Sequence, residues 1–414
     1  MNLVNSISGF LEIIENIGIE DYVFRGQNEP YEGIVANGFR DYSGGWETDK
    51  IPDMNYIQNQ FKNSIIGKIS AEEKEYFLAY CQHYGIQTNL IDFSYSPLVA
   101  LFFACEGKED IKFLPKKLVN FENWDDLLED ENKQKMLIMN MINETRKSSY
   151  SQYAQVYLLK RERLIDITDL VCRLNGKNLF DELLKKKEIF KEFCKLVNRH
   201  FAFVKNEAIK SQWIINTAEE YLRISTYYSE NYGFQIDGVL EIENALLWYK
   251  DNVNGNENFR LIRLIETINN IDDSDEELIL NSIISQTGEF QNDRKSVPFL
   301  VLFFKIIELV KSMPAKIKLY FDVYFTYQPP NLFERISNQQ GLFIYQTYLY
   351  ENDCTYDYHE LIVQEVIPDI TIEIDDYKRV LNNLALLGIN YGTIYNDMDN
   401  VAKAVRGRSK KWLE

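Results

Sequence analysis

Histidine, cysteine and proline are all scarce in this chain of 414 residues. The three histidines form no HExxH pattern, so a histidine-rich metal site is not expected. The five cysteines are an odd number without a CxxC pair, which argues against a zinc ribbon and a disulfide framework. We therefore expect buried free thiols and no metal. Few prolines and no Ser/Gly-rich tract argue against a flexible linker.

Long hydrophobic runs are also missing. No stretch reaches the roughly 18 consecutive apolar residues of a membrane-spanning helix. The densest one, residues 297–310, is interrupted by Lys305 and Glu308. The N-terminal residues show no basic start, no apolar centre and no small-residue cleavage site of a secretory signal. We expect a cytoplasmic protein that does not act on a membrane.

Positive charge is in short supply as well. Lys and Arg number 45 against 63 Asp and Glu, which gives a formal net charge of -18. A surface this acidic repels a phosphate backbone, so a broad nucleic-acid groove is not expected. A basic pocket for one small phosphorylated ligand stays compatible with this charge, because such a pocket needs only one or two cations.

The chain does contain short strand patterns and long stretches of helical periodicity. Strand-like runs occur at 22–24, 89–93, 155–159, 319–325, 341–350 and 361–368. Apolar residues recur at helical spacing in 3–17, 55–81, 96–104 and 376–387, and also in 179–200, 204–223, 257–269 and 275–285. These patterns predict an α+β protein with a mixed sheet. Residues 1–171 and 321–414 form its core, and 172–320 form a mainly helical insertion that we expect to be a partner-binding or regulatory lobe.

Three segments carry recognisable motifs. The first is Phe24-Arg25-Gly26-Gln27, followed by Arg40; the second is a long run from Gln82 to Ala104; the third comprises 335–343, Ile367-Pro368 and the C-terminal sequences LxxLGIN and IYNDMDNVA. In this order the segments resemble the FRG domain, a bacterial family named for its Phe-Arg-Gly tripeptide. The resemblance covers about 20–105, 151–170 and 325–405. Gln87 and Asn89 depart from it, because the family usually has Pro and Arg there.

A more distant similarity concerns ADP-ribosyltransferases of the arginine–serine–glutamate type. Their motifs resemble Phe24-Arg25-Gly26, then Ser94-x-Ser96 with the helix at 99–104, and finally Glu365 before Val366-Ile367-Pro368. This resemblance implies a transferase-like mixed-sheet core and an NAD-consuming enzyme, which transfers ADP-ribose or hydrolyses NAD. It also implies a role as a toxin or an antiphage effector, with a protein acceptor or regulator as partner.

The same resemblance suggests a role for each site residue. Arg25 would grip the NAD pyrophosphate with its planar guanidinium, beside the N-terminus of the helix that starts at Pro97. Glu365 would stabilise an oxocarbenium ion during cleavage, with Ser94 and His83 as further catalytic groups. The remaining binding residues would be Gly26, Gln27, His83, Tyr84, Ser94, Ser96 and Gln340.

Simpler structural roles compete with these assignments. Arg25 could pair with an internal carboxylate such as Asp92, and His83 could be a buried histidine with its hydrogen bonds satisfied. Ser96 precedes Pro97 in the pattern of a helix N-cap, and Glu365 could lie on the solvated face of a strand. Two alternatives to an enzyme therefore stay open. One is a non-catalytic nucleotide-binding or protein-interaction module that keeps the FRG fold, and the other is an interaction protein that acts through its helical insertion.

Overall fold

The computed structural model describes residues 2–29, 33–40, 54–108, 153–233, 235–236, 239–251, 295–312, 317–330, 332–352 and 359–396, together with 398, 400–402 and 405. The helices expected at 257–269 and 275–285 lie outside these residues. Within the described part, no helix has both the length and the apolar character needed to cross a bilayer.

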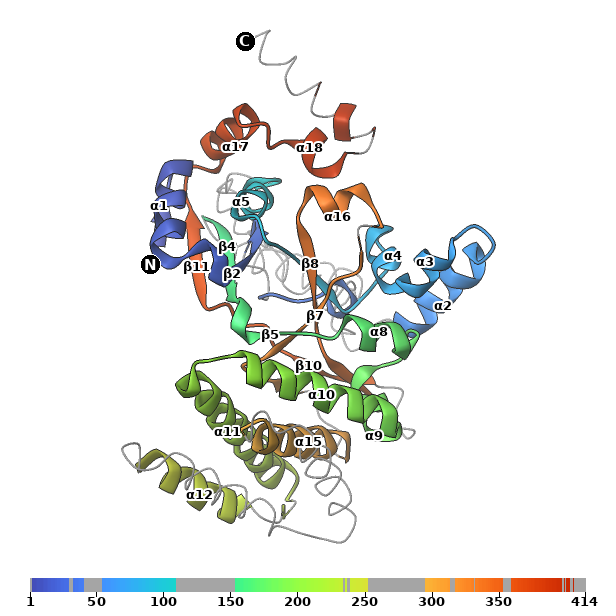
Figure 1. The fold of residues 1–414 in the computed structure, drawn as a ribbon, viewed down its shortest axis with the longest axis vertical. Helices are drawn as coiled ribbons and strands as arrows, with labels where there is room; N and C mark the ends of the chain where they lie inside the picture. Colours follow the sequence, from blue (N-terminus) through green and yellow to red (C-terminus); the bar gives the residue numbers. More distant parts are fainter. Residues whose placement is uncertain are drawn as a thin grey trace, which may run out of the picture.

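The described part is built on an eight-stranded sheet (Figure 1). Its spatial order is β1 (Asn2–Val4), β11 (Ile370–Ile374), β4 (Ala154–Lys160), β2 (Tyr22–Gln27), β3 (Leu90–Ser94), β8 (Gly341–Tyr345), β7 (Tyr324–Tyr327) and β5 (Leu164–Asp166). The pairs β1–β11 and β5–β7 are parallel, and the other five neighbouring pairs are antiparallel. The sheet is therefore mixed, and the α+β class is confirmed.

The eight strands divide into two halves that meet at one residue pair. All of β2 pairs with β4, from Tyr22–Lys160 to Gln27–Gln155. All of β3 pairs with β8, from Leu90–Tyr345 to Ser94–Gly341. Between β2 and β3, only Phe24 and Ser94 are paired. The two strands diverge beyond this pair, so the centre of the sheet is split.

A second, three-stranded sheet contains β6 (Lys318–Leu319), β10 (His359–Gln364) and β9 (Tyr348–Asn352), in this order. The single strand expected at 341–350 is thus two strands, β8 and β9, in different sheets. Gln346 and Thr347 interrupt it. Both are buried, and their side chains bond to Gln364: the Gln346 amide donates to its carbonyl and Thr347 Oγ1 to its side-chain oxygen.

One half of the large sheet is covered by α1 (Ile7–Ile17), α5 (Pro97–Cys105) and α17 (Tyr377–Leu386), which lie together at the top left of Figure 1. Their apolar residues form one buried cluster with β2, β4 and β11. The amphipathic pattern of 3–17 begins with strand β1 and becomes helical only after the N-cap Ser6. Ser96 caps α5 as predicted, since its hydroxyl accepts from Val99 N at 3.4 Å.

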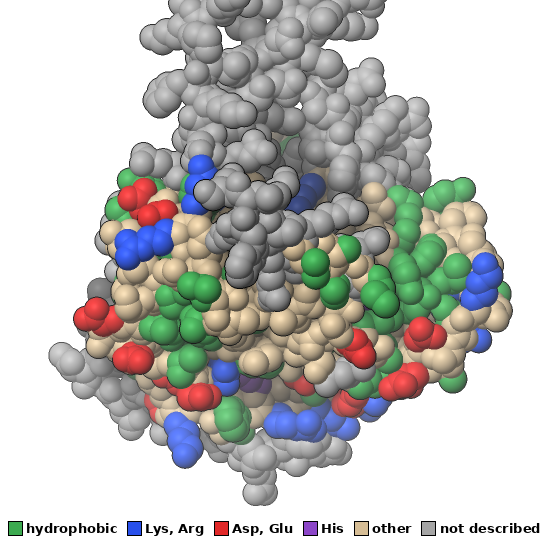
Figure 2. Space-filling view, turned by 90° about the horizontal axis from the view of Figure 1, so that it is seen from above, with side chains coloured by type: hydrophobic (Ala, Val, Ile, Leu, Met, Phe, Trp, Pro, Cys, Tyr) green, Lys and Arg blue, Asp and Glu red, His purple; other side chains and the backbone are tan. Residues whose placement is uncertain are grey.

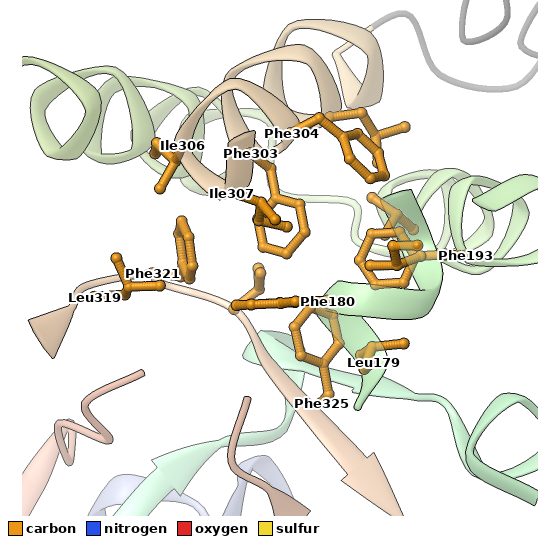
Figure 3. Packing of buried hydrophobic residues seen from close by; sticks show 14 of the residues in the cluster. Leu179, Phe180, Phe193, Phe303, Phe304, Ile306, Ile307, Leu319, Phe321 and Phe325 are labelled. Atoms are coloured by element: carbon orange, nitrogen blue, oxygen red, sulfur yellow. The ribbon is translucent and has the colours of Figure 1, made fainter. Parts of the chain in front are cut away.

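The other half of the sheet packs against the helical insertion. Its helices are α8 (Thr168–Leu174), α9 (Leu179–Lys185), α10 (Lys187–Phe203), α11 (Glu207–Tyr232), α12 (Val239–Asp251) and α15 (Ser296–Ser312). In Figure 3, Phe193 of α10 and Phe303 of α15 approach Phe325 of β7, with centroid distances of 5.4 and 6.1 Å to its ring. Helices and strands thus share one buried cluster. The insertion therefore shares its core with the sheet, and its role as a partner-binding or regulatory lobe stays a prediction.

Short helices complete the fold. The periodic stretch 55–81 is three helices, namely α2 (Met54–Ile65), α3 (Ala71–Glu75) and α4 (Phe77–His83), which lie together at the right of Figure 1. The helices α16 (Glu334–Asn338) and α18 (Tyr391–Tyr395) lie in contact near the upper end of β8. Three 3-10 turns occupy Ile19–Asp21, Asn37–Phe39 and Arg161–Arg163.

Candidate ligand-binding cleft

A cleft of about 320 Å³ opens where β2 and β3 diverge. Residues of both strands, of α5, of α16 and of adjoining turns line it. The lining includes three arginines and two carboxylates. These charged residues are Arg25, Arg40, Arg335, Asp92 and Glu106. The cleft therefore brings together parts of all three motif segments that were recognised in the sequence.

The Phe-Arg-Gly tripeptide lies at the split of the sheet, and each of its residues has a different environment. Phe24 is fully buried in the cluster beneath α5. Gly26 faces the same helix so closely that an added Cβ atom would lie 1.9 Å from Ala100 O and 2.4 Å from Ala104 N. Side chains alternate along a strand, so Arg25 points to the opposite face. Phe24 thus fixes the strand in the core, Gly26 allows the close approach of α5, and Arg25 places its guanidinium on the other face.

Arg25 bridges the gap between the diverging strands. Its Nη1 donates to the Asp92 carbonyl oxygen at 2.8 Å, and its Nε donates to Gln27 Oε1 at 3.0 Å. Gln27 is itself buried, and its amide group donates to the carbonyls of Glu29 and Gly33 at 3.3 and 3.4 Å. Gln27 therefore orients the guanidinium. Arg25 thus bonds to the backbone carbonyl of Asp92 and not to its carboxylate, the internal partner that the sequence suggested.

The second motif forms a hydrogen-bond chain that orients the Asp92 carboxylate. Thr88 Oγ1 donates to Gln82 Oε1 at 2.5 Å, and Gln82 Nε2 donates to Asp92 Oδ2 at 3.0 Å. Thr88 is buried, while Asp92 is exposed at the cleft. Three positions of the recognised run, 82, 88 and 92, thus act together to hold one acceptor group.

Two further arginines and one glutamate complete the charged lining. Arg40 donates from Nε and Nη2 to the Val35 carbonyl at 3.2 and 3.1 Å. The Arg335 guanidinium lies 4.7 Å from the ring centroid of Tyr395, and the Tyr395 hydroxyl donates to Glu106 Oε2 at 3.0 Å. Burial, with a smaller contribution from Glu106, raises the pKa of Tyr395, so its phenol stays a neutral donor at physiological pH.

Both motif serines bind the backbone. Ser94 lines the cleft, but its hydroxyl donates to the Gln339 carbonyl at 2.6 Å and accepts from Ser96 N at 2.9 Å. It thereby ties the end of β3 to the end of α16. Ser96 is the N-cap of α5. These contacts give each serine a structural task, and a catalytic role of Ser94 stays a prediction.

The predicted binding residues His83, Tyr84 and Gln340 are not among the residues that line the cleft. His83 stacks on Phe333 with parallel rings 3.9 Å apart, and Tyr84 is 56% exposed. Both belong to an aromatic group on the flank with α2 to α4, where Figure 2 shows hydrophobic side chains gathered. Gln340 has a positive φ of 45° in the turn before β8, where its carbonyl accepts from Tyr95 N at 3.0 Å.

Glu365 also lies away from the cleft. It follows β10 in the small sheet, where its backbone N–H donates to the Leu319 carbonyl at 2.8 Å. Its carboxylate pairs with Lys318 at 3.4 Å. The pKa of Tyr320 is raised by burial and, to a smaller extent, by a hydrogen bond with Glu365. The structure therefore does not bring Glu365 together with Arg25.

Five residues line the cleft although the sequence patterns suggested no site role for them: Arg40, Arg335, Asp92, Gln339 and Glu106. The first four belong to the recognised motifs, and a polar residue within these motifs could have been predicted to lie at the site. Glu106 follows the helix of the second run and carried no such signal. No three His, Cys, Asp or Glu side chains in the described part of the chain lie close enough to hold a metal ion.

Comparison with known proteins agrees with the first of the two resemblances. No curated protein and no solved structure matches the chain significantly. The ADP-ribosyltransferase resemblance accordingly has no support from these comparisons. The model of the FRG domain family matches residues 20–112, the segment that carries β2, β3, α5 and most of the lining of the cleft.

Proposed function

We propose that the cleft between β2 and β3 binds a small phosphorylated ligand of the nucleotide class. The observation that carries this proposal is the meeting of Arg25, Arg40 and Arg335 in one cleft. Within the described residues, neither Arg40 nor Arg335 has an ion-pair partner. Arg40 donates to the Val35 carbonyl, and the Arg335 guanidinium lies over the Tyr395 ring. These cations keep their capacity to bind an anion.

The chemistry of the cleft fits a ligand with both phosphate and hydroxyl groups. A guanidinium can hold two phosphate oxygens in a bidentate fork. One side of α5 also borders the cleft, with Val99, Ala100 and Phe103 as apolar lining. The carboxylates of Asp92 and Glu106 are acceptors that suit sugar hydroxyls. On a chain with net charge -18, three arginines against two carboxylates make an unusual positive site.

NAD cleavage is the second candidate function, since the cleft also contains carboxylates near Arg25. Glu106 or Asp92 would then stabilise the oxocarbenium ion in place of Glu365. Glu106 is the better candidate, because it is half-buried and held by Tyr395, whereas Asp92 is exposed. The transferase-like core and a protein acceptor or regulator that contacts the insertion belong to this proposal.

Isothermal titration calorimetry with ADP and with NAD tests the binding proposal. Arg25→Lys and Arg40→Gln should each weaken binding by about 1.5–3 kcal/mol, the scale of a hydrogen bond to a charged group. Arg379→Gln on α17 is the matched control, because Arg379 is exposed and does not line the cleft. Unchanged affinity in both cleft variants, with the fold intact by circular dichroism, would refute the proposal.

Nicotinamide release distinguishes an enzyme from a binding module. If the protein cleaves NAD, Glu106→Gln should lower turnover by two or more orders of magnitude, on the order of 3 kcal/mol in activation free energy. Its NAD affinity should change little, since the carboxylate acts mainly in the transition state. Glu365→Gln is the control and should keep full turnover. NAD binding without nicotinamide release would leave the binding module as the function.

A further inference from the structure

A second, larger cavity lies where the FRG-matching segment meets the helical insertion. It holds about 400 Å³, within the range of small-molecule pockets, and is separate from the arginine cleft. The helices α2, α3 and α4 form one wall, and the end of α8 with the following turn forms the other. Lys62 Nζ of α2 donates to Asn175 Oδ1 of that turn at 3.1 Å, so one hydrogen bond joins the two walls.

The wall formed by α2 is polar where a packed helix is normally apolar. Asn55, Gln58, Asn59 and Lys62 recur at helical spacing and all line the cavity. Gln58 is more than nine-tenths buried; its amide nitrogen donates to the Gln87 carbonyl at 2.9 Å. Its amide oxygen has no partner among the described residues. A polar helix face over a cavity offers directional hydrogen bonds to a bound molecule.

The floor of the cavity is aromatic. Tyr327, Tyr345 and Tyr348 line it, and each is at least 95% buried. Burial raises the pKa of Tyr345 to about 12, so this phenol is neutral at physiological pH, and it is already bonded to Asn89. These nearly buried tyrosines close the base of the cavity. The half-buried Phe77 also lines it and offers an apolar ring surface, which favours a planar group.

The rim is cationic on an otherwise acidic molecule. Lys62, Lys74 and Lys177 line the cavity together with one carboxylate, Glu75. In the part of the chain that the structure describes, only Lys177 has an ion-pair partner, Glu182 at 3.7 Å. Lys62 instead contacts the Asn175 amide and lies 5.4 Å from the Phe77 ring centroid. Two lysines without a carboxylate partner remain available for an anionic group.

From these three surfaces we propose that the cavity is a second ligand site, which binds a small anion with a planar aromatic ring. The ring would lie against Phe77 above the buried tyrosines, the amides of α2 would bond to its edge, and Lys62 and Lys74 would hold the anionic group. A ligand placed there touches both α2 and the turn after α8. It would therefore couple the FRG-matching segment to the insertion, independently of the arginine cleft.

Cys172 provides a reporter for this site. It lines the cavity and is half-buried, while Cys81, Cys105 and Cys194 are buried. Burial raises the pKa of Cys172 to about 11, so alkylation by N-ethylmaleimide at mildly alkaline pH is slow enough to time. The probe is AMP, and mass spectrometry of the Cys172 peptide measures the rate. AMP at about ten times its Kd should slow alkylation about tenfold, because only the free protein reacts.

Matched ligands and variants make the test specific. Adenosine lacks the charge and ribose 5-phosphate lacks the ring, so each should protect Cys172 less than AMP does. Lys62→Met should weaken AMP binding about tenfold, as expected for loss of a charged contact, so the same AMP concentration should slow alkylation only about twofold. Lys68→Met should not, because Lys68 is exposed and outside the cavity. Lys74→Met replaces Lys62→Met if that variant does not fold.

Three results would overturn this assignment. The first is unchanged alkylation of Cys172 at millimolar AMP, and the second is equal protection in the wild type and in Lys62→Met. The third is protection that disappears in Arg25→Lys while it survives in Lys62→Met, since AMP would then act from the arginine cleft. Protection that persists in Arg25→Lys supports the second site, whatever the outcome of the binding experiment on the first.

Discussion

Replacing Gly26 by alanine should be among the most destabilising small substitutions in this protein. The added Cβ atom would lie 1.9 Å from Ala100 O and 2.4 Å from Ala104 N, both backbone atoms of α5. Backbone atoms cannot turn aside as a flexible side chain can. To reach an ordinary contact of 3.4 Å, strand and helix must separate by about 1.5 Å.

That separation would disturb a fully packed region. Phe24, Ala100, Leu101 and Ala104 are buried there with at most 1% exposure. Overpacking in a core costs about 1–3 kcal/mol and sometimes more. Because the obstacle is the helix backbone, we expect a loss of about 3 kcal/mol in unfolding free energy, at the upper end of this range.

Urea denaturation followed by far-ultraviolet circular dichroism measures this loss. With an m-value of about 3 kcal/mol/M, the midpoint should fall by about 1 M. Gly67→Ala is the control, because no atom lies within 4 Å of a Cβ at that position. Its midpoint should stay the same or rise slightly, since alanine restricts the unfolded chain. Equal midpoints for Gly26→Ala and the wild type would show that the close approach of β2 and α5 is not required.

Three other predictions concern packing and protonation. Burial lowers the pKa of His200, so the unfolded state binds a proton at this residue before the folded state does as pH falls. The free energy of unfolding should therefore decrease below the ordinary imidazole pKa of 6.5. His200→Gln should make the urea midpoint depend less on pH in this range. The Lys108 side chain is 1% exposed and pairs with Glu29 at 2.7 Å, so Lys108→Met should lower the free energy of unfolding by about 3 kcal/mol. Adding Glu29→Gln should restore most of this loss, which a double-mutant cycle measures. Joining residue 171 to 321 by a short linker should give aggregates in size-exclusion chromatography, because it uncovers Phe325 and its neighbours; a soluble monomer would contradict the shared core.

Local signals in the sequence predicted much of the structure around the cleft. The Ser96-Pro97 pair predicted the start of α5, and the short apolar runs predicted β2 and β3 to within a few residues. Most motif residues that line the cleft belong to these elements, whereas Arg335 and Gln339 come from α16, far along the chain. Short-range patterns therefore sufficed to find Arg25 and its surroundings.

Pairing between distant strands decided the rest, and no local pattern encodes it. Glu365 was assigned to the site because it follows Arg25 and Ser94 in the expected order. Its strand, β10, pairs with β9 and β6 in the second sheet, which places the carboxylate beside Lys318. The packing of the insertion on the sheet is likewise not encoded locally, because Phe193 of α10 contacts Phe325 of β7, which comes much later in the chain.

The way the two central strands are paired bears on how the chain acquires its fold. Neither strand of the FRG-matching segment finds a complete partner inside residues 20–112, because β2 needs β4 and β3 needs β8. During synthesis this segment leaves the ribosome before residue 345 has been made, so β3 cannot pair with β8 until then. A chain cut after residue 112 should therefore stay unfolded and be degraded quickly, since strand edges that lack partners are exposed. In this chain the FRG-matching segment thus depends on two strands, β4 and β8, that are encoded outside it.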